Sequence, residues 1–258
     1  MNLNEYETFR AATEQGGSLE GGGINDHSAA MFNFLSNLQQ SQGIKGHLME
    51  IGVWKGHTAS LLALLQQEQE RLFLSDMTIR EQEVQAWRDL MIPGQDKKFQ
   101  FLHGDSGVLR KRNVLHELFG EFRWVHIDGE HSYEGVISDL DLAFDCIGRS
   151  GIVACDDVFH PMSACVTQAI FDYVARNAHK ARLLVLGFCK AYPTTPYWYD
   201  FYHQACYKEL LPTFDEAKLP ITLCLNGWNQ SSDYYSIIPR RSEGKYVTIG
   251  QFHEDIPS

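Results

Sequence analysis

The stretch from Leu48 to Ser60, L-M-E-I-G-V-W-K-G-H-T-A-S, constrains the fold of this chain most. It begins with a short apolar run that predicts a buried strand, and Gly52 and Gly56 follow. Apolar residues at helical spacing resume after Thr58. Because glycines let the backbone approach a ligand closely, a strand, glycine turn and helix in this order predict a nucleotide-like cofactor at the turn.

The glycine spacing distinguishes this turn from a dinucleotide site. A dinucleotide fingerprint reads G-x-G-x-x-G and packs a pyrophosphate against a helix N-terminus. Here the glycines are four residues apart and Glu50 precedes them. An acidic strand end without a phosphate nest suits a cofactor with positive charge and no phosphate, such as S-adenosylmethionine. The alternatives are an NAD-dependent oxidoreductase, which the spacing disfavours, and a non-catalytic α/β protein that binds a cofactor or metal.

Later segments repeat the alternation of strand and helix that an α/β domain requires. Arg71–Asp76 reads as a short apolar strand, and the carboxylate of Asp76 at its end suits the two hydroxyls of a ribose. Phe99–His103 reads as the next strand. Asp105 and Ser106 follow it and are candidates for contacts with an adenine edge, although Gly-Asp-Ser is also ordinary turn chemistry.

Carboxylates end the next two strands, Phe122–Ile127 and Gly151–Cys155. In a mostly parallel sheet the carboxyl ends of the strands meet at one edge, so Asp128, Asp156 and Asp157 should converge there. Three close carboxylates resist ionisation unless a cation balances them. Oxygen ligands favour Mg²⁺, Mn²⁺ or Ca²⁺, and we therefore predict a divalent metal held by these three residues.

The chain resembles the class I S-adenosylmethionine-dependent O-methyltransferases, in particular the metal-dependent, macrocin O-methyltransferase-like enzymes that act on natural-product sugars. Four segments carry the resemblance: E-I-G-V-W-K-G at 50–56, I-D-G-E-H-S-Y-E-G-V at 127–136, D-L-D-L at 139–142 and G-I-V-A-C-D-D-V at 151–158. The resemblance implies a doubly wound, Rossmann-like α/β fold. Its sheet would have seven strands, mostly parallel with an antiparallel last strand, and helices on both faces.

The resemblance also implies an activity, the transfer of a methyl group to a hydroxyl of a small molecule, a sugar or natural product, with Mg²⁺ or another divalent cation such as Mn²⁺. It assigns the metal to Asp128, Asp156 and Asp157. It assigns the cofactor to Glu50, Gly52, Asp76, Asp105 and Ser106, and the glycine turn adds Gly56 as a sixth candidate. Relatives that methylate catechols carry asparagine and lysine where this chain has Asp157 and His131, which disfavours a catechol acceptor.

His131 is the candidate general base, because its ordinary pKa of about 6.5 suits both protonation states near neutrality. Asp128 is the alternative or additional base. In a third interpretation His131 only begins the helix that follows.

Composition bounds the partners and the setting. The formal net charge is −11 and the isoelectric point is near 5.4, which argues against a nucleic-acid partner. The six cysteines form no C-x-x-C pair, so we expect reduced thiols in a cytoplasmic protein. Residues 1–15 are polar and mixed in charge, and we expect neither a signal peptide nor a membrane span.

We expect one methyltransferase domain over residues 1–258 with three parts. Residues 1–43 form a helical leader or lid, residues 44–189 form the cofactor-binding core, and residues 190–258 form a sheet edge. Helices are expected near 29–38, 58–68, 80–90, 108–119, 134–147 and 164–177, with a sixth strand at 182–186.

The third part is rich in aromatic residues between Tyr192 and Tyr202. These rings suit a substrate pocket, a homodimer interface or simple cover for the sheet, and the sequence leaves the three open. The seventh, antiparallel strand is expected at Ile221–Leu225 or Tyr234–Ile238.

Overall fold

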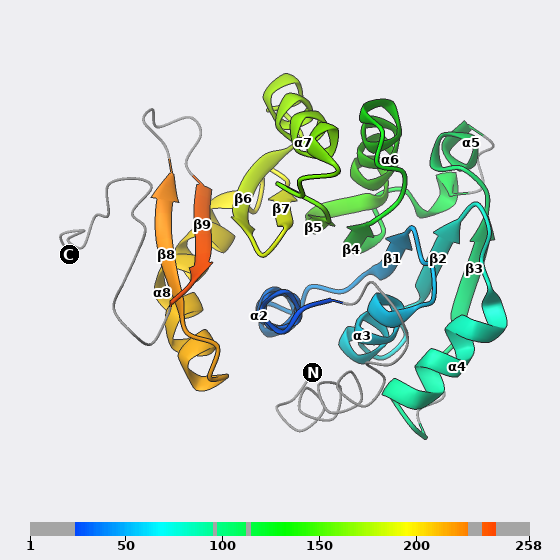
Figure 1. The fold of residues 1–258 in the computed structure, drawn as a ribbon, viewed down its shortest axis with the longest axis horizontal. Helices are drawn as coiled ribbons and strands as arrows, with labels where there is room; N and C mark the ends of the chain where they lie inside the picture. The colour runs from blue at the N-terminus through cyan, green and yellow to red at the C-terminus, as the bar shows by residue number, and fades with distance from the viewer. Residues whose placement is uncertain (1–23, 95–96, 112–114, 227–233, 241–258) are drawn as a thin grey trace.

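A twisted sheet runs through the middle of the molecule, with helices on both of its faces (Figure 1). The computed structural model describes residues 24–94, 97–111, 115–226 and 234–240. Within these residues the sheet has nine strands in the order β3-β2-β1-β4-β5-β7-β6-β9-β8. The strands are β1 (His47–Ile51), β2 (Leu72–Asp76), β3 (Phe99–His103), β4 (Phe122–Ile127), β5 (Ile147–Cys155), β6 (Arg182–Gly187), β7 (Lys190–Thr194), β8 (Ile221–Asn226) and β9 (Tyr234–Pro239).

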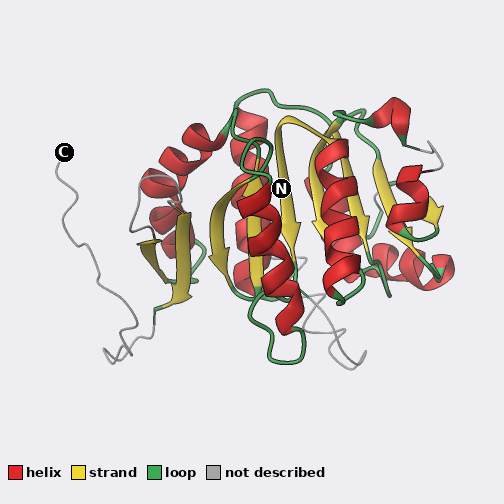
Figure 2. Ribbon diagram, turned by 90° about the horizontal axis from the view of Figure 1, so that it is seen from above, coloured by secondary structure: helices red, strands yellow, loops and turns green. Residues whose placement is uncertain are grey.

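Helices lie on both faces of the sheet, and the view from above shows helices running along the strands (Figure 2). They are α2 (Asp26–Ser41), α3 (His57–Leu65), α4 (Glu81–Met91), α5 (Ser106–Lys111), the short 3₁₀ turn η1 (His116–Leu118), α6 (Tyr133–Cys146), α7 (Ala164–Arg176) and α8 (Tyr199–Glu216). In Figure 1, α5, α6 and α7 cover one face of the sheet, and α2, α3, α4 and α8 cover the other. None of the described helices is long and apolar enough to cross a membrane.

The parallel core confirms the predicted doubly wound α/β fold. Strands β1 to β5 pair in parallel with one another. β1 shows how the two faces are filled: Leu48 packs in the core on the α2 side, whereas Met49 and Ile51 pack on the α6 side. This alternation follows from the two-residue period of a strand.

The position of the antiparallel strand was predicted wrongly. β7 is antiparallel to both β5 and β6 and lies between them, and it begins at Lys190. A two-residue turn, Phe188 and Cys189, joins it to β6, and both residues have positive φ angles of 54° and 60°. Turns of this kind usually carry Asn-Gly, which is absent here. Pro193 lies within the strand, and a proline disfavours the prediction of a strand from the sequence.

The two segments expected to supply that strand form an added pair at the edge of the sheet instead. β8 and β9 are antiparallel to each other, and β9 pairs in parallel with β6. The described sheet is therefore two strands wider than the seven that were expected.

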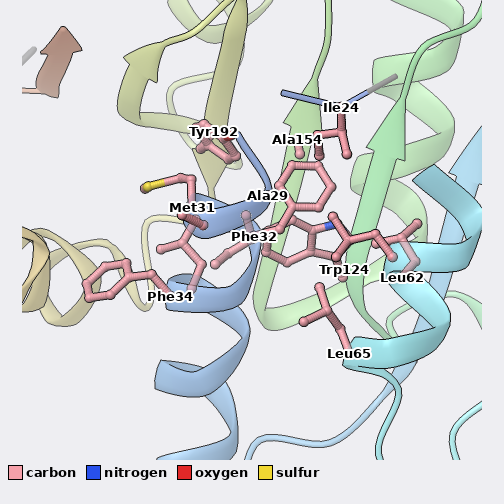
Figure 3. Packing of buried hydrophobic residues seen from close by; sticks show 14 of the residues in the cluster. Ile24, Ala29, Met31, Phe32, Phe34, Leu62, Leu65, Trp124, Ala154 and Tyr192 are labelled. Carbon is pink, nitrogen blue, oxygen red and sulfur yellow. The ribbon is translucent and has the colours of Figure 1, made fainter. Parts of the chain in front are cut away.

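The aromatic segment mostly covers the sheet. Tyr192 lies in β7, and Tyr199 and Tyr202 lie in α8, a helix that was not predicted; all three are buried, whereas Tyr197 is 70% exposed. Phe32 of α2 packs on Trp124 of β4 with ring centroids 4.8 Å apart, in the cluster that also holds Tyr192 (Figure 3). Residues 1–23 of the expected leader lie outside the described residues, and α2 itself is part of the core.

Candidate active site

A cavity of about 430 Å³ lies at the carboxyl ends of β1 to β4. This is the edge at which an open α/β sheet binds ligands. Its lining consists of Ile51, Gly52, Trp54, Ser75, Asp76, Met77, Gly104, Asp105, Ser106, Asp128, Gly129, Glu130, Gly135 and Asp139. Four of the six predicted cofactor residues are among them, and Glu50 and Gly56 are not.

The two glycines of the turn serve the packing of the backbone. Gly52 has a φ angle of 84°, and a Cβ there would lie 1.9 Å from the carbonyl oxygen of Asp128. Gly56 has a φ angle of 87°, and a Cβ there would lie 2.7 Å from Cγ1 of Val84 in α4. Gly52 therefore lets the ends of β1 and β4 meet beside the cavity, while Gly56 lets α3 begin against α4.

Asp76 fastens the glycine turn to the end of β2. Its Oδ2 accepts hydrogen bonds from the backbone N–H groups of Val53 and Trp54 at 2.8 and 3.3 Å, and its Oδ1 accepts one from Thr78 at 3.1 Å. A carboxylate offers about four lone-pair positions, so acceptor capacity remains for a ligand in the cavity.

Asp105 and Ser106 begin α5 beside the cavity. Asp105 is exposed, and its Oδ1 accepts a hydrogen bond from the N–H of Val108 at 3.1 Å. Ser106 is buried, and its Oγ lies 3.2 Å from Oγ of Ser138.

Asp139 in α6 is a cavity residue that the sequence reasoning missed. Its side chain is buried, and among the described residues its Oδ2 has no hydrogen-bond partner. Burial raises the pKa of Asp139 to about 6, against the effect of the neighbouring Ser106 hydroxyl. A signal was present, because Asp139 stands at helical spacing from Val136 and Ala143 on the apolar side of α6.

Glu50 lies behind the cavity on the side of the sheet that α2 covers. It is 2% exposed, and its Oε1 lies 3.1 Å from Nδ1 of His126. Burial, with the nearby charge of Asp128, raises the pKa of Glu50 well above its ordinary value. Its Oε2 has no hydrogen-bond partner in the described part of the chain. An acidic group with a free oxygen suits the cationic methionine end of the predicted cofactor.

Asp128, His131 and Asp157 form the group that fits a metal ion. One ligand atom from each lies within 4.8 Å of the others. His131 Nε2 lies 3.0 Å from Asp157 Oδ2 and 3.7 Å from Asp128 Oδ1. The nearby carboxylate of Asp128, with those of Asp157 and Asp156, raises the pKa of His131. Ser132, whose side chain accepts a hydrogen bond from the N–H of Gly135, caps α6, so the imidazole is not needed to begin that helix.

Asp156 does not join this group. Its Oδ2 pairs with the ammonium of Lys190, and its Oδ1 accepts a hydrogen bond from the N–H of Asp157 at 2.8 Å. Although burial opposes ionisation, Lys190 lowers the pKa of Asp156. The sequence reasoning also missed Lys190, a buried cation in β7; its only signal was a lone lysine in the apolar run F-C-K-A-Y.

Comparisons with known proteins agree with this fold. Residues 49–158 match the family model described as a methyltransferase domain. No curated protein sequence matches the chain. Many solved structures are similar, the following three among them. The O-methyltransferase NovP is 17% identical with a TM-score of 0.52, over 65% of this chain and 80% of NovP. The cofactor-bound Rv0187 from MTB is 14% identical with a TM-score of 0.54, over 75% of this chain and 90% of that chain.

The third is the MycE methyltransferase from the mycinamycin biosynthetic pathway, in complex with Mg and SAH. It is 13% identical with a TM-score of 0.50, over 73% of this chain and 54% of MycE. At these identities the solved structures share the fold, and the family match covers the segment that holds Glu50, the metal group and Asp139. Residues 49–158 of this chain are thus similar to a methyltransferase domain.

Proposed function

We propose that this chain is a Mg²⁺-assisted O-methyltransferase that moves the methyl group of S-adenosylmethionine to a hydroxyl of a small molecule. The observation that carries the proposal is the group of Asp128, His131 and Asp157. Asp128 also lines the cofactor cavity, so an acceptor oxygen at the metal group would lie close to the cofactor. MycE, solved in complex with Mg and SAH, supports the presence of a metal and an adenosyl cofactor together on this fold.

We assign the direct metal contacts to Asp128 and Asp157. Asp156 was predicted as a third ligand, but both of its oxygens already have partners in the protein. We expect Asp156 to contribute negative charge near the metal, balanced by Lys190, and not to bind the metal directly. Mg²⁺ commonly takes one or two protein carboxylates and completes its shell with water and substrate oxygens, so two aspartates suffice.

A divalent cation bound there would stabilise negative charge on the acceptor oxygen. His131 would accept the proton that the hydroxyl loses as its oxygen takes the methyl group, because its Nε2 lies within the same group of atoms. Asp128, 3.7 Å from that nitrogen, would orient the imidazole and stabilise its protonated form. Asp128 as the base itself remains the alternative.

The cofactor would lie along the cavity. Asp76 would accept hydrogen bonds from the ribose hydroxyls, Asp105 and Ser106 would border the adenine, and Glu50 would attract the methionine end. Gly52 and Gly56 would act through the shape of the backbone that surrounds it.

The acceptor class that we propose is a sugar or a sugar-bearing natural product. This chain has His131 in place of the lysine of the catechol-type enzymes. The O-methyltransferase NovP and MycE, a methyltransferase from the mycinamycin biosynthetic pathway, have the same fold. The setting we propose is the cytoplasm, in line with six free cysteines and a net charge of −11. A homo-oligomer is a further proposal, which the elution volume of the purified protein tests.

Calorimetric titration with S-adenosylmethionine and with NAD tests the cofactor. We expect binding of the first only, and NAD binding alone would favour the oxidoreductase. Transfer of labelled methyl groups to a panel of hydroxyl compounds then tests the reaction. EDTA should abolish methyl transfer and leave cofactor binding largely intact. Addition of Mg²⁺ should restore the transfer. Full activity after exhaustive chelation and dialysis would remove the metal from the mechanism. Cofactor binding without transfer to any acceptor would favour a non-catalytic protein.

A further inference from the structure

Asp139 is the one buried acid in the lining of the cofactor cavity to which the proposed reaction gives no task. It is 4% exposed, and a hydrogen-bond donor for its Oδ2 is missing from the described residues. A buried polar atom without a partner costs free energy, and natural proteins rarely leave one unless a ligand or water completes it.

The surroundings of this Oδ2 atom define where its partner must come from. Oδ2 of Asp139 lies 2.5 Å from the point where a Cβ of Gly129 would be, so it reaches the loop that follows β4. Ser106, at the start of α5 just after β3, borders the same carboxyl group and affects its pKa. Asp139 therefore lies where the loops after β3 and β4 meet, whereas Asp76, the candidate for the ribose, ends β2.

We infer that Asp139 recognises the nucleobase of the cofactor: its Oδ2 accepts a hydrogen bond from the exocyclic amino group of adenine. The inference rests on the proposed use of S-adenosylmethionine. A carboxylate oxygen needs a donor, and the amino group is the N–H donor that an adenine ring carries when it is attached to ribose. Burial makes this contact selective, since a base with a carbonyl oxygen in place of the amino group would set two acceptors against each other.

Asp105, the acid that the sequence suggested for the adenine, is less suited to this task. It is exposed, and one of its oxygens already accepts the N–H of Val108. Water competes for the hydrogen bonds of an exposed carboxylate, so such a group distinguishes bases weakly. Asp139 is sheltered from that competition.

The test compares S-adenosylhomocysteine with its deaminated analogue, S-inosylhomocysteine, by calorimetry. The parent should bind the adenine compound about ten- to hundredfold more tightly, because a hydrogen bond to a charged acceptor usually contributes that much to affinity. Asp139→Ala should lose most of this preference, chiefly through weaker binding of the adenine compound. Asp139→Asn, which keeps an acceptor oxygen, should retain part of it. Glu134→Gln, an exposed acid on the same helix, is the matched control and should behave as the parent.

The cofactor-free melting temperature separates a binding role from a structural one. Because no described residue donates a hydrogen bond to Oδ2 of this carboxyl group, Asp139→Asn should melt no lower than the parent. An Asn variant that melts lower and keeps the full preference for adenine would overturn the inference. So would an Ala variant that loses affinity equally for both compounds, which would indicate a ribose contact. If the parent binds neither compound, the proposed function fails, and this inference fails with it.

Discussion

At the scale of single residues, the site is built from acids whose partners differ. Asp76 binds three backbone N–H groups, Asp156 binds a lysine, and Asp157 faces an imidazole. Asp139 keeps an oxygen without a partner among the described residues. These partners assign different tasks to residues that look alike in the sequence, and each task has its own test.

Asp76 should affect both cofactor affinity and folding. Asp76→Ala removes an acceptor for the ribose, and we expect about ten- to hundredfold weaker binding of S-adenosylmethionine. It also leaves the N–H groups of Val53 and Trp54 without their acceptor, so the cofactor-free melting temperature should fall. Asp76→Asn keeps one acceptor oxygen and should show smaller changes. Unchanged affinity in the Ala variant would remove Asp76 from the ribose site.

His131 should affect the rate more than the fold. Because His131 is the proposed base, His131→Ala should lower turnover by about 10²- to 10⁴-fold with little change in cofactor affinity. The melting temperature should hold, because Ser132 caps α6. His179→Ala, at an exposed histidine, is the control. Near-normal turnover of the His131 variant would assign the proton to Asp128.

The two neighbouring aspartates should differ in metal affinity. Asp157→Asn should weaken Mn²⁺ binding by tenfold or more, since Asp157 belongs to the metal group. Asp156→Asn should weaken it less, but should lower the melting temperature because the buried Lys190 loses its charged partner. Calorimetric titration of both variants with Mn²⁺ measures this. Equal losses of affinity would restore Asp156 as a direct ligand.

At the scale of elements, a buried ion pair holds the end of the sheet opposite to the site. Arg123, at the start of β4, binds Glu70 through two hydrogen bonds of 2.7 and 2.9 Å, and both side chains are almost fully buried. The same guanidinium donates to Ser36 and Gln39 of α2. The pair thus joins β4 to α2 and to the loop before β2.

Breaking this pair should be strongly destabilising. Arg123→Leu leaves the Glu70 carboxylate buried without its cation, and we expect a loss of about 3–5 kcal/mol in the free energy of unfolding. Arg80→Leu breaks an exposed pair with Glu83 and should cost about 0–1 kcal/mol. Urea unfolding of both variants measures the difference. Similar costs at the two positions would contradict the role given to Arg123.

At the scale of the whole molecule, Asp139 should appear in the pH dependence of folding. Its pKa is about 6 in the folded chain against an ordinary 3.8, raised by burial and by the charges of Asp105 and Glu130. The folded form therefore holds the proton more tightly than the unfolded form. The stability that this group adds is present below about pH 3.8 and is lost as the pH rises through about 6.

Asp139→Asn has no such titration. The stability of the variant relative to the parent should rise between pH 4 and about 6 and then level off, as measured by urea unfolding across that range. A difference that stays constant with pH would mean that Asp139 does not titrate in the folded chain as described.

Much of the parallel core could be predicted from the chain itself. Residues 47–155 alternate between apolar strands and amphipathic helices, and each period depends on neighbours a few residues away. The positions of Gly52, Asp76 and Asp128 at strand ends followed from the same local pattern. Their meeting at one edge followed from a general property of parallel sheets, that all carboxyl ends lie on the same side.

The tertiary structure alone decided what those residues contact. β7 enters between β5 and β6 through a turn without glycine, and that insertion brings Lys190 to Asp156, 34 residues away in the chain. Packing of α6 on the sheet buries Asp139 beside Gly129, and the assembly of β4, α2 and the loop before β2 pairs Arg123 with Glu70. The sequence determined the elements and their order because backbone periodicity is local. Partners and pKa values depend on burial and on contacts between distant segments, which exist only once the sheet has formed.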